Sequence, residues 1–127
     1  MNQPGQQNNT SFYGLGIAPK ILEIIDRMKF KGTTPIQHKA IPIALEGKDI
    51  IGIAQTGTGK TLAFGVPMVQ RLVQSAARGL VLVPTRELAL QVEETLNKIG
   101  QPLGLRTAVL IGGASMYNQV AILRRNP

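Results

Sequence analysis

The chain has 127 residues, which suits one small domain, and 43% of them are hydrophobic, which excludes a disordered composition. It contains no cysteine, which excludes disulfides and thiolate metal sites and favours a cytoplasmic location, and it has no apolar run of membrane-spanning length. Its formal net charge of +7 favours an anionic partner such as nucleic acid, although charge alone is equally compatible with a solubilising surface.

The beginning of the chain is expected to be a flexible tail followed by a helix. Residues 1–11 are rich in Asn and Gln and carry no charged side chain, so they lack the basic start and apolar middle of a signal peptide. A helix is predicted to begin at Pro19 and to continue to Met28, because isoleucines recur there at helical spacing after a proline in the first turn.

A second helix is predicted after a Thr-Pro pair. Thr34 is a good N-cap and Pro35 a good first helical residue. Pro42 is expected to break or kink this helix, and Gly47 is expected to end it.

The segment that follows predicts a phosphate site. Residues 50–53 are an apolar run typical of a buried strand, and residues 54–61 read Ala-Gln-Thr-Gly-Thr-Gly-Lys-Thr before a helical pattern. This order matches the strand, glycine-rich loop and helix of nucleoside triphosphatases, with Ala54 in place of the usual first glycine. The glycines let backbone N–H groups converge on phosphate oxygens, and the helix N-terminus adds partial positive charge. The alternative is a tight strand-to-helix turn with an exposed lysine.

Strands and helices are predicted to alternate through the rest of the chain. A helix is predicted from Lys60, with a kink expected at Pro67, and residues 79–83 are predicted to form a second strand. Thr85 is expected to cap a helix that ends at Gly100. A third strand over residues 107–111, the Gly112-Gly113 turn and a helix over residues 116–123 complete the pattern.

This alternation predicts an α/β fold, in which helices flank a parallel sheet as in P-loop nucleoside triphosphatases. Ligands of such sheets bind beyond the carboxyl ends of the strands. The phosphate loop, residues 84–86 and Gly112-Gly113 each follow a predicted strand, so one rim of the sheet should carry all three.

Four segments in this order resemble the first RecA-like domain of DEAD-box ATP-dependent RNA helicases. Phe12, Phe30 and residues 35–37 are similar to the family's adenine-sensing segment, and residues 54–61 to its phosphate loop. Residues 84–91, Pro-Thr-Arg-Glu-Leu-Ala-Leu-Gln, are similar to a segment that grips the RNA backbone, and Gly112-Gly113 resembles a further RNA-contacting turn.

The resemblance implies ATP and Mg²⁺ as ligands and RNA as a partner, with no membrane and a monomeric chain. The expected catalytic residues are Lys60, on the terminal phosphates, and Thr61, on Mg²⁺. The expected nucleotide-binding residues are Phe30, Gln37, Gln55, Thr56, Gly57, Thr58, Gly59, Lys60 and Thr61. The expected RNA-binding residues are Pro84, Thr85, Arg86 and Gly113, which should contact the backbone without reading its sequence.

Residue chemistry is compatible with these roles and with simpler ones. The carboxamide of Gln37 can accept from the adenine amino group and donate to N7, but without the resemblance it is an ordinary helix-surface glutamine. Phe30 could stack on adenine or pack in the core. Phe12 could belong to the adenine-sensing segment or could simply anchor the tail. Arg86 lies in the first turn of a helix, where it could face a phosphate or only water.

The sequence departs from the family in two ways. Lys29 stands where a glycine usually precedes Phe30. The family's Asp-Glu-Ala-Asp and Ser-Ala-Thr segments and its second RecA-like domain are absent from these 127 residues. We therefore expect the N-terminal part of the first helicase domain, over residues 12–127, with little activity by itself. A non-catalytic nucleotide- or RNA-binding module that acts with another subunit is the alternative, and an unrelated P-loop kinase or transporter ATPase is a third.

Overall fold

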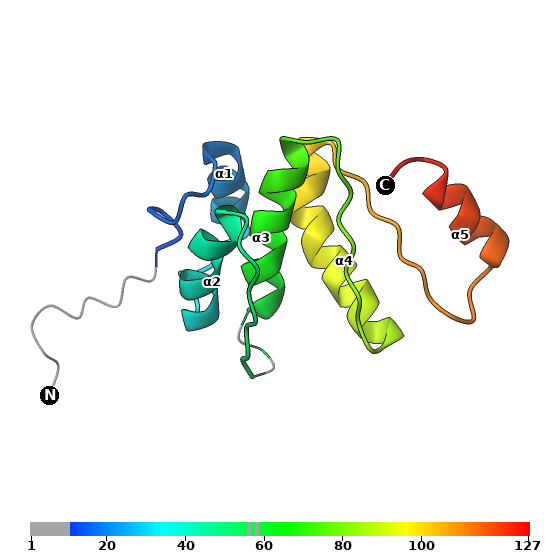
Figure 1. Cartoon of the computed structure of the whole chain (residues 1–127), viewed down its shortest axis with the longest axis horizontal. Helices are drawn as coiled ribbons and strands as arrows, with labels where there is room; N and C mark the ends of the chain where they lie inside the picture. The colour runs from blue at the N-terminus through cyan, green and yellow to red at the C-terminus, as the bar shows by residue number, and fades with distance from the viewer. Residues whose placement is uncertain (1–10, 56, 58) are drawn as a thin grey trace, which may run out of the picture.

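The computed structural model describes residues 11–55, 57 and 59–127. Within these ranges the chain forms five α-helices and one short 3₁₀-helix, joined by segments without regular structure (Figure 1). The helices are α1 (Pro19–Arg27), α2 (Pro35–Leu45), α3 (Lys60–Val73), α4 (Arg86–Gly100) and α5 (Met116–Leu123), and the 3₁₀-helix η1 is Gln101–Leu103.

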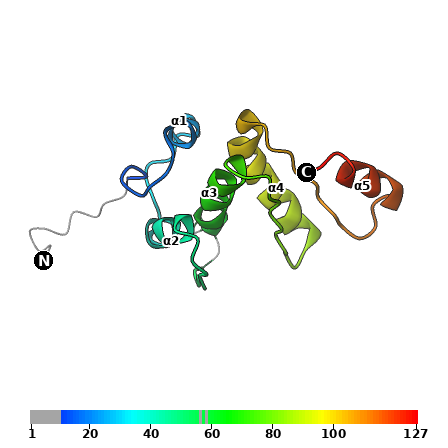
Figure 2. The same cartoon turned by 45° about the horizontal axis from the view of Figure 1, so that its top comes forward.

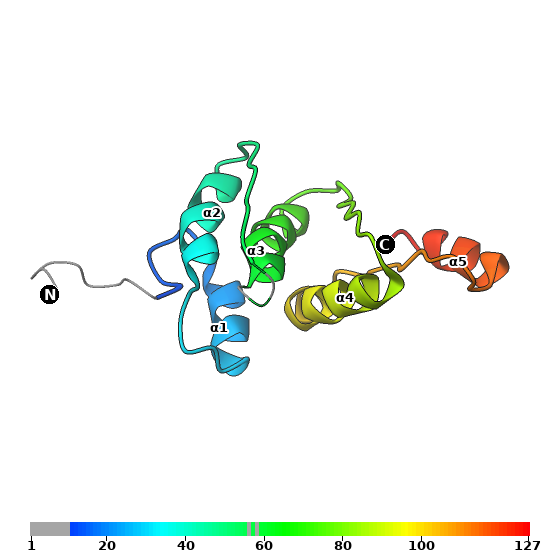
Figure 3. The ribbon, with the colours of Figure 1, turned by 90° about the horizontal axis from the view of Figure 1, so that it is seen from below.

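The first four helices share one hydrophobic core. Helix α3 lies between α2 and α4, and α5 lies at the opposite end of the molecule from α1 and α2 (Figures 1 and 3). The core side chains, all at most 7% exposed, are Phe12, Leu15, Ile17, Ile21, Ile25, Ile41, Leu62, Val66, Val69 and Ile99. Burial of an aliphatic side chain of this kind contributes about 1.5–3 kcal/mol, so this cluster is the main stabilising element of the helical layer.

The segment before α1 belongs to this layer. Phe12 and Leu15 pack into the core, and the Tyr13 hydroxyl donates a 2.7 Å hydrogen bond to the Asp26 carboxylate of α1. This hydrogen bond raises the pKa of the Tyr13 hydroxyl. Of the predicted tail, only Ser11 lies within the described residues.

The predicted helices and their caps are confirmed, with one exception at a proline. Thr34 accepts from the backbone N–H of Gln37, and Thr85 accepts from that of Leu88, so both act as N-caps. Pro42, however, lies inside a continuous α2 and does not break it. A proline removes only one helical hydrogen bond, and Ile41 beside it is fully buried against α3, which compensates for that loss.

The expected parallel sheet is not formed in the described residues. The three predicted strands, over residues 50–53, 79–83 and 107–111, have no ladder partner, although each one runs to the lower edge of Figure 1 before the next element begins. Several of their apolar side chains are exposed to solvent: Ile51 is 93% exposed and Leu82 is 86% exposed. An apolar run adopts strand structure only when a neighbour satisfies its backbone, and the described neighbours of these runs are helices.

Candidate functional site

Two glycines of the loop before α3 have the left-handed backbone that the phosphate-loop interpretation expects of glycine there. Gly57 and Gly59 have φ angles of +81° and +80°, in the left-handed region that favours glycine. Helix α3 begins at the next residue, Lys60, and its N-cap Gly59 offers no side chain to cap it. The first N–H groups of α3 therefore have no intrahelical acceptor, and an anion could accept from them.

Gln37 joins α2 to this loop. Gln37 is only 3% exposed, and both ends of its side-chain amide are hydrogen-bonded. Oε1 accepts from the Thr34 N–H at 3.0 Å, and Nε2 donates to the Gly59 carbonyl at 3.1 Å. A Cβ atom on Gly59 would overlap Nε2 and lie 3.2 Å from Thr34 Oγ1. The predicted adenine-sensing segment and the predicted phosphate loop thus meet at Gly59.

This geometry excludes the simple alternative for Gln37 and adds a role that the sequence did not predict. A helix-surface glutamine would be exposed, whereas this one is 3% exposed. Its adenine contact stays a prediction, and the amide could make it while keeping both protein partners, because the oxygen can accept and the nitrogen can donate one further hydrogen bond.

Phe30 lies between the core and solvent. Its ring is 6.3 Å from the ring of Phe12 at an interplanar angle of 50°, and 46% of Phe30 is exposed. One face of Phe30 is therefore supported by a core residue while the rest remains available for stacking. Lys29, where the family usually has glycine, adopts φ +57°, so the backbone keeps a left-handed turn at a residue that disfavours it.

Two buried polar atoms flank the start of α2. Thr33 Oγ1 and His38 Nδ1 have no hydrogen-bond partner among the described residues. Thr33 is 9% exposed and precedes the N-cap Thr34. His38 is partly buried and does not cap the helix.

A second cluster forms where α4 begins. Thr85 Oγ1 accepts from the Leu88 N–H at 3.2 Å, which fixes the first turn of α4 and the backbone of Arg86. The Arg86 guanidinium lies against the glycine turn that precedes α5: a Cβ atom on Gly113 would be 2.8 Å from Nη1 and 3.2 Å from Cζ. The structure thus brings together the two segments that the resemblance assigns to RNA.

Gln119 is a residue of this cluster that the sequence analysis missed. Its Oε1 accepts from the Ile111 N–H at 2.8 Å, and its Nε2 donates to the Ile111 carbonyl at 3.1 Å. Its bonds depend on a return of the chain that no local pattern encodes, so no sequence signal identified it.

The two clusters lie at one edge of the molecule. We call Thr34, Gln37, Gly59 and Lys60 the loop cluster, and Thr85, Arg86, Gly113 and Gln119 the turn cluster. The starts of α3 and α4 and the turn before α5 lie along the lower edge in two views (Figures 1 and 2). Of the remaining predicted residues, Thr61 is half-buried, Gln55 and Pro84 are exposed, and Thr56 and Thr58 lie outside the described residues.

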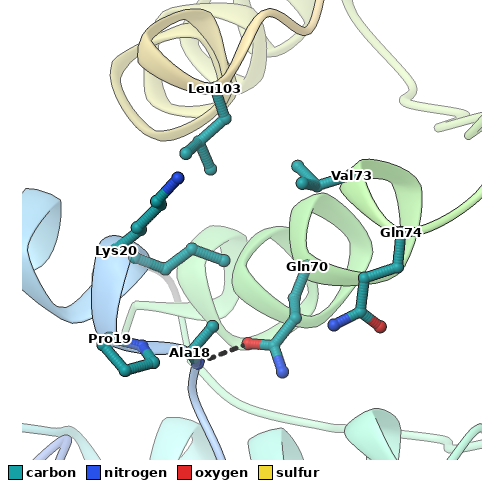
Figure 4. A pocket seen from close by; sticks show the side chains of 8 residues that line it. Ala18, Pro19, Lys20, Gln70, Val73, Gln74 and Leu103 are labelled. Carbon is teal, nitrogen blue, oxygen red and sulfur yellow. Dashed lines mark hydrogen bonds between the residues drawn. The ribbon is translucent and has the colours of Figure 1, made fainter.

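A cavity of about 370 Å³ lies elsewhere, between the start of α1, the end of α3 and η1. Gln70 closes one side of it by accepting from the Ala18 N–H at 2.8 Å, and Leu103 and Val73 add apolar walls (Figure 4). None of the predicted site residues lines it, so it is distinct from both clusters.

Neither a metal-ligand cluster nor a membrane-spanning helix occurs among the described residues. There, no group of three His, Asp or Glu side chains could hold a metal ion by itself. Among the same residues, no helix combines the length and the apolar character needed to cross a bilayer.

The chain resembles curated and solved RNA helicases. It is 54% identical over 119 residues to the ATP-dependent rRNA helicase RRP3 of Debaryomyces hansenii, a match that covers 92% of this chain and 25% of that protein. It superposes on the RNA helicase Prp28 of Chaetomium thermophilum bound to ADP with a TM-score of 0.81 and 36% identity, over 98% of this chain and 31% of that one. For Dbp5 of S. cerevisiae bound to RNA and ADP BeF₃, the TM-score is 0.66 and the identity 38%, over 72% of this chain and 25% of Dbp5.

These matches extend over nearly the whole chain but only part of each relative. The chain spans about a quarter of the length of the curated relatives that it matches. The model of the DEAD/DEAH box helicase family matches residues 34–127, which include both the loop cluster and the turn cluster. The protein therefore belongs to the DEAD/DEAH box helicase family.

Proposed function

We propose that this chain is the ATP-binding and RNA-contacting part of an ATP-dependent RNA helicase, and that the full-length protein separates short RNA duplexes. Several relatives are named ATP-dependent RNA helicases, and two of the similar structures hold RNA together with a nucleotide analogue. A cytoplasmic location for this protein fits its cysteine-free sequence.

The loop cluster is the proposed nucleotide site. The N–H groups at the start of α3 would donate to the β- and γ-phosphates, and the exposed Lys60 ammonium would offset their negative charge. Gln55, Thr56, Gly57 and Thr58 would complete the loop around the phosphates. Gln37 and Phe30 would hold the adenine, one by hydrogen bonds to its edge and the other by stacking on its face.

The residues fit a magnesium ion that arrives with the nucleotide. Thr61 follows Lys60 in the first turn of α3, and its hydroxyl is an oxygen ligand of the kind that Mg²⁺ prefers. Because Mg²⁺ usually keeps several waters, one protein hydroxyl and the phosphate oxygens suffice for binding. When bound, the ion neutralises charge on the phosphates. Thr61 would hold the ion beside the phosphates that Lys60 contacts.

The turn cluster is the proposed RNA site. In the described part of the chain the Arg86 guanidinium makes no ion pair, so its donors are free for a phosphate. Thr85, Pro84 and the Gly113 backbone would contact the same strand. Such contacts hold the sugar-phosphate backbone and carry little sequence information.

We further propose that residues 50–53, 79–83 and 107–111 pair as parallel strands in the full-length protein. Each run precedes a helix or turn at the same edge of the molecule, as strands of a βαβ fold do. Their bare isoleucines and leucines, such as Ile53 at 91% exposure, would then be covered by other parts of the protein.

The contact between Gln37 and Gly59 is the observation that best supports this proposal, because it unites an adenine-type segment with a phosphate-type loop. The test measures ATP hydrolysis by the full-length protein with and without single-stranded RNA. We expect RNA to stimulate hydrolysis, and Lys60→Ala to abolish it. Lys39→Ala, at an exposed lysine of α2, is the matched control and should leave it unchanged. Hydrolysis that ignores RNA would favour another P-loop enzyme, and RNA binding without hydrolysis would favour a non-catalytic module.

A further inference from the structure

The side chain of Gln119 occupies the place of a strand partner. Its amide satisfies both backbone groups of Ile111, by accepting from the N–H at 2.8 Å and donating to the carbonyl at 3.1 Å. The same Nε2 lies 3.4 Å from the carbonyl oxygens of Ala114 and Ser115. One side chain on α5 therefore contacts the backbone on both sides of Gly112 and Gly113.

The α5 helix is itself fixed to this turn. Ser115 is its N-cap, and its hydroxyl accepts from the Asn118 N–H at 3.3 Å. This cap ends the turn one residue before α5 begins, and Gln119 lies in the first turn of α5. Cap and amide together restrict residues 111–115 to one conformation, in which Gly113 has φ +79°.

Arg86 depends on that conformation. Its guanidinium lies over Gly113, where a Cβ atom would be 2.8 Å from Nη1 and 3.2 Å from Nη2. Gly112 differs, because a Cβ there would be 3.9 Å from Nη2, which is ordinary contact. The missing side chain at Gly113 therefore provides the space that the guanidinium fills.

We propose that Gln119 is a positioning residue for RNA binding: it holds the 111–115 turn, and the turn holds the Arg86 guanidinium toward a backbone phosphate. This inference rests on the proposed RNA function of Arg86 and adds a residue on a different helix. An exposed arginine loses rotamer freedom when it binds, so a turn that restricts it beforehand reduces the entropic cost of binding.

The first test replaces Gln119 in the full-length protein and measures affinity for single-stranded RNA over a range of salt concentrations. Gln119→Leu keeps a similar volume but removes all four amide contacts. We expect RNA affinity to fall by about tenfold and the salt slope to decrease by about 0.7, as for the loss of one charged phosphate contact on a single strand. ATP affinity should stay unchanged. Asn118→Ala, at the exposed neighbouring residue, is the control and should have no effect.

The second test compares the two glycines of the turn. Gly113→Asn tolerates the left-handed backbone but places a Cβ against the guanidinium, so RNA affinity should fall as for Gln119→Leu. Gly112→Ala, whose Cβ would be in ordinary contact with the guanidinium, should lower RNA affinity less than Gly113→Asn. This pair keeps the proposal testable if Gln119→Leu disturbs α5. Equal RNA affinities for both glycine variants and the wild-type protein would overturn the proposal.

A double-mutant comparison separates the proposal from the function on which it rests. If Gln119 acts through Arg86, then Arg86→Ala combined with Gln119→Leu should weaken RNA binding no more than Arg86→Ala alone. Additive losses would show that Gln119 acts independently and would overturn the positioning role. If Arg86→Ala itself leaves RNA binding unchanged, the proposed RNA function of the turn cluster fails first.

Discussion

The loop cluster and the turn cluster reach the same edge of the molecule by different physical means. In the loop cluster, a 3% exposed glutamine is hydrogen-bonded at both ends of its amide, so the geometry is set by buried contacts next to the core. In the turn cluster, Arg86 is exposed, and its guanidinium lies against Gly113. The Gln119 amide holds this glycine turn by hydrogen bonds to the backbone.

This difference suits two different ligands. The base of a nucleotide is rigid, and a buried, directional amide can distinguish one base from another. An RNA backbone is uniform and flexible, and an exposed guanidinium can bind any phosphate along it. Substitutions in the loop cluster should therefore affect stability and nucleotide binding together, whereas those in the turn cluster should affect RNA binding alone.

The largest expected effect is at Gly59. Gly59→Ala forces a Cβ into the Gln37 amide in addition to the left-handed strain of about 1–2 kcal/mol. We expect ATP binding to fall below detection in a titration and the free energy of unfolding to decrease. Gly57→Ala shares the strain, but its Cβ would have open space, so it should retain measurable binding. Equal losses for the two variants would show that Gln37 does not matter to the loop.

Gln37→Ala should have the next largest effect. It removes the acceptor of the Thr34 N–H and a donor to the Gly59 carbonyl, and an unsatisfied buried group costs about 1–3 kcal/mol. Chemical denaturation should show this loss in the free energy of unfolding. Competition between ATP and GTP should show that any preference for ATP disappears, whereas the exposed control Gln91→Ala should change neither quantity. A retained ATP preference would leave Gln37 with its structural role only.

The turn cluster predicts that RNA affinity depends on salt. For single strands, the logarithm of affinity should fall with the logarithm of salt concentration by about 0.7 for each phosphate that a cation neutralises. RNAs of different sequence and equal length should bind with similar affinities. Fluorescence anisotropy over a salt series measures both properties. A flat salt dependence would contradict phosphate contacts by Arg86.

The smallest expected effect is a gain of stability beside Phe30. Lys29 has φ +57°, which costs a non-glycine residue about 1–2 kcal/mol, partly offset by the greater unfolded-state freedom of glycine. Lys29→Gly should therefore raise the free energy of unfolding by up to about 1 kcal/mol. Lys31→Gly, at an exposed lysine of the same loop, is the control and should not stabilise the protein. A loss of stability for Lys29→Gly would show that the lysine side chain makes up for its backbone strain.

Local signals in the sequence predicted the helices well. Thr34 and Thr85 act as N-caps as expected, because a cap depends only on residues within one turn. Glu94 and Lys98 form an ion pair at 3.4 Å, which follows from a local rule as well, because residues four apart are neighbours on a helix face. The break that was one of the two predicted effects of Pro42 does not occur, because α2 continues past this residue, beside the fully buried Ile41.

Features that depend on distant segments were not predicted. The strand pattern of residues 79–83 indicates what that segment can form, but a ladder requires a neighbour that the described residues do not supply. The bond between Gln37 and Gly59 links residues 22 positions apart, and the Gln119 contacts depend on how the chain returns after Gly113. Sequence patterns predicted most residues of the two clusters, Gln37 included, but not the hydrogen bonds that Gln37 and Gln119 make there.

The proposed function depends most on phosphate binding by the loop before α3. Comparing ATP with AMP measures the contribution of that loop alone. Both ligands carry adenine, but only ATP carries the β- and γ-phosphates that Lys60 and the start of α3 should hold. Calorimetric titration of the full-length protein with Mg²⁺ should show ATP binding at least about tenfold more tightly than AMP, as expected for a charge-assisted contact. Lys60→Ala should remove that difference. Equal affinities for ATP and AMP in the wild-type protein would contradict the account.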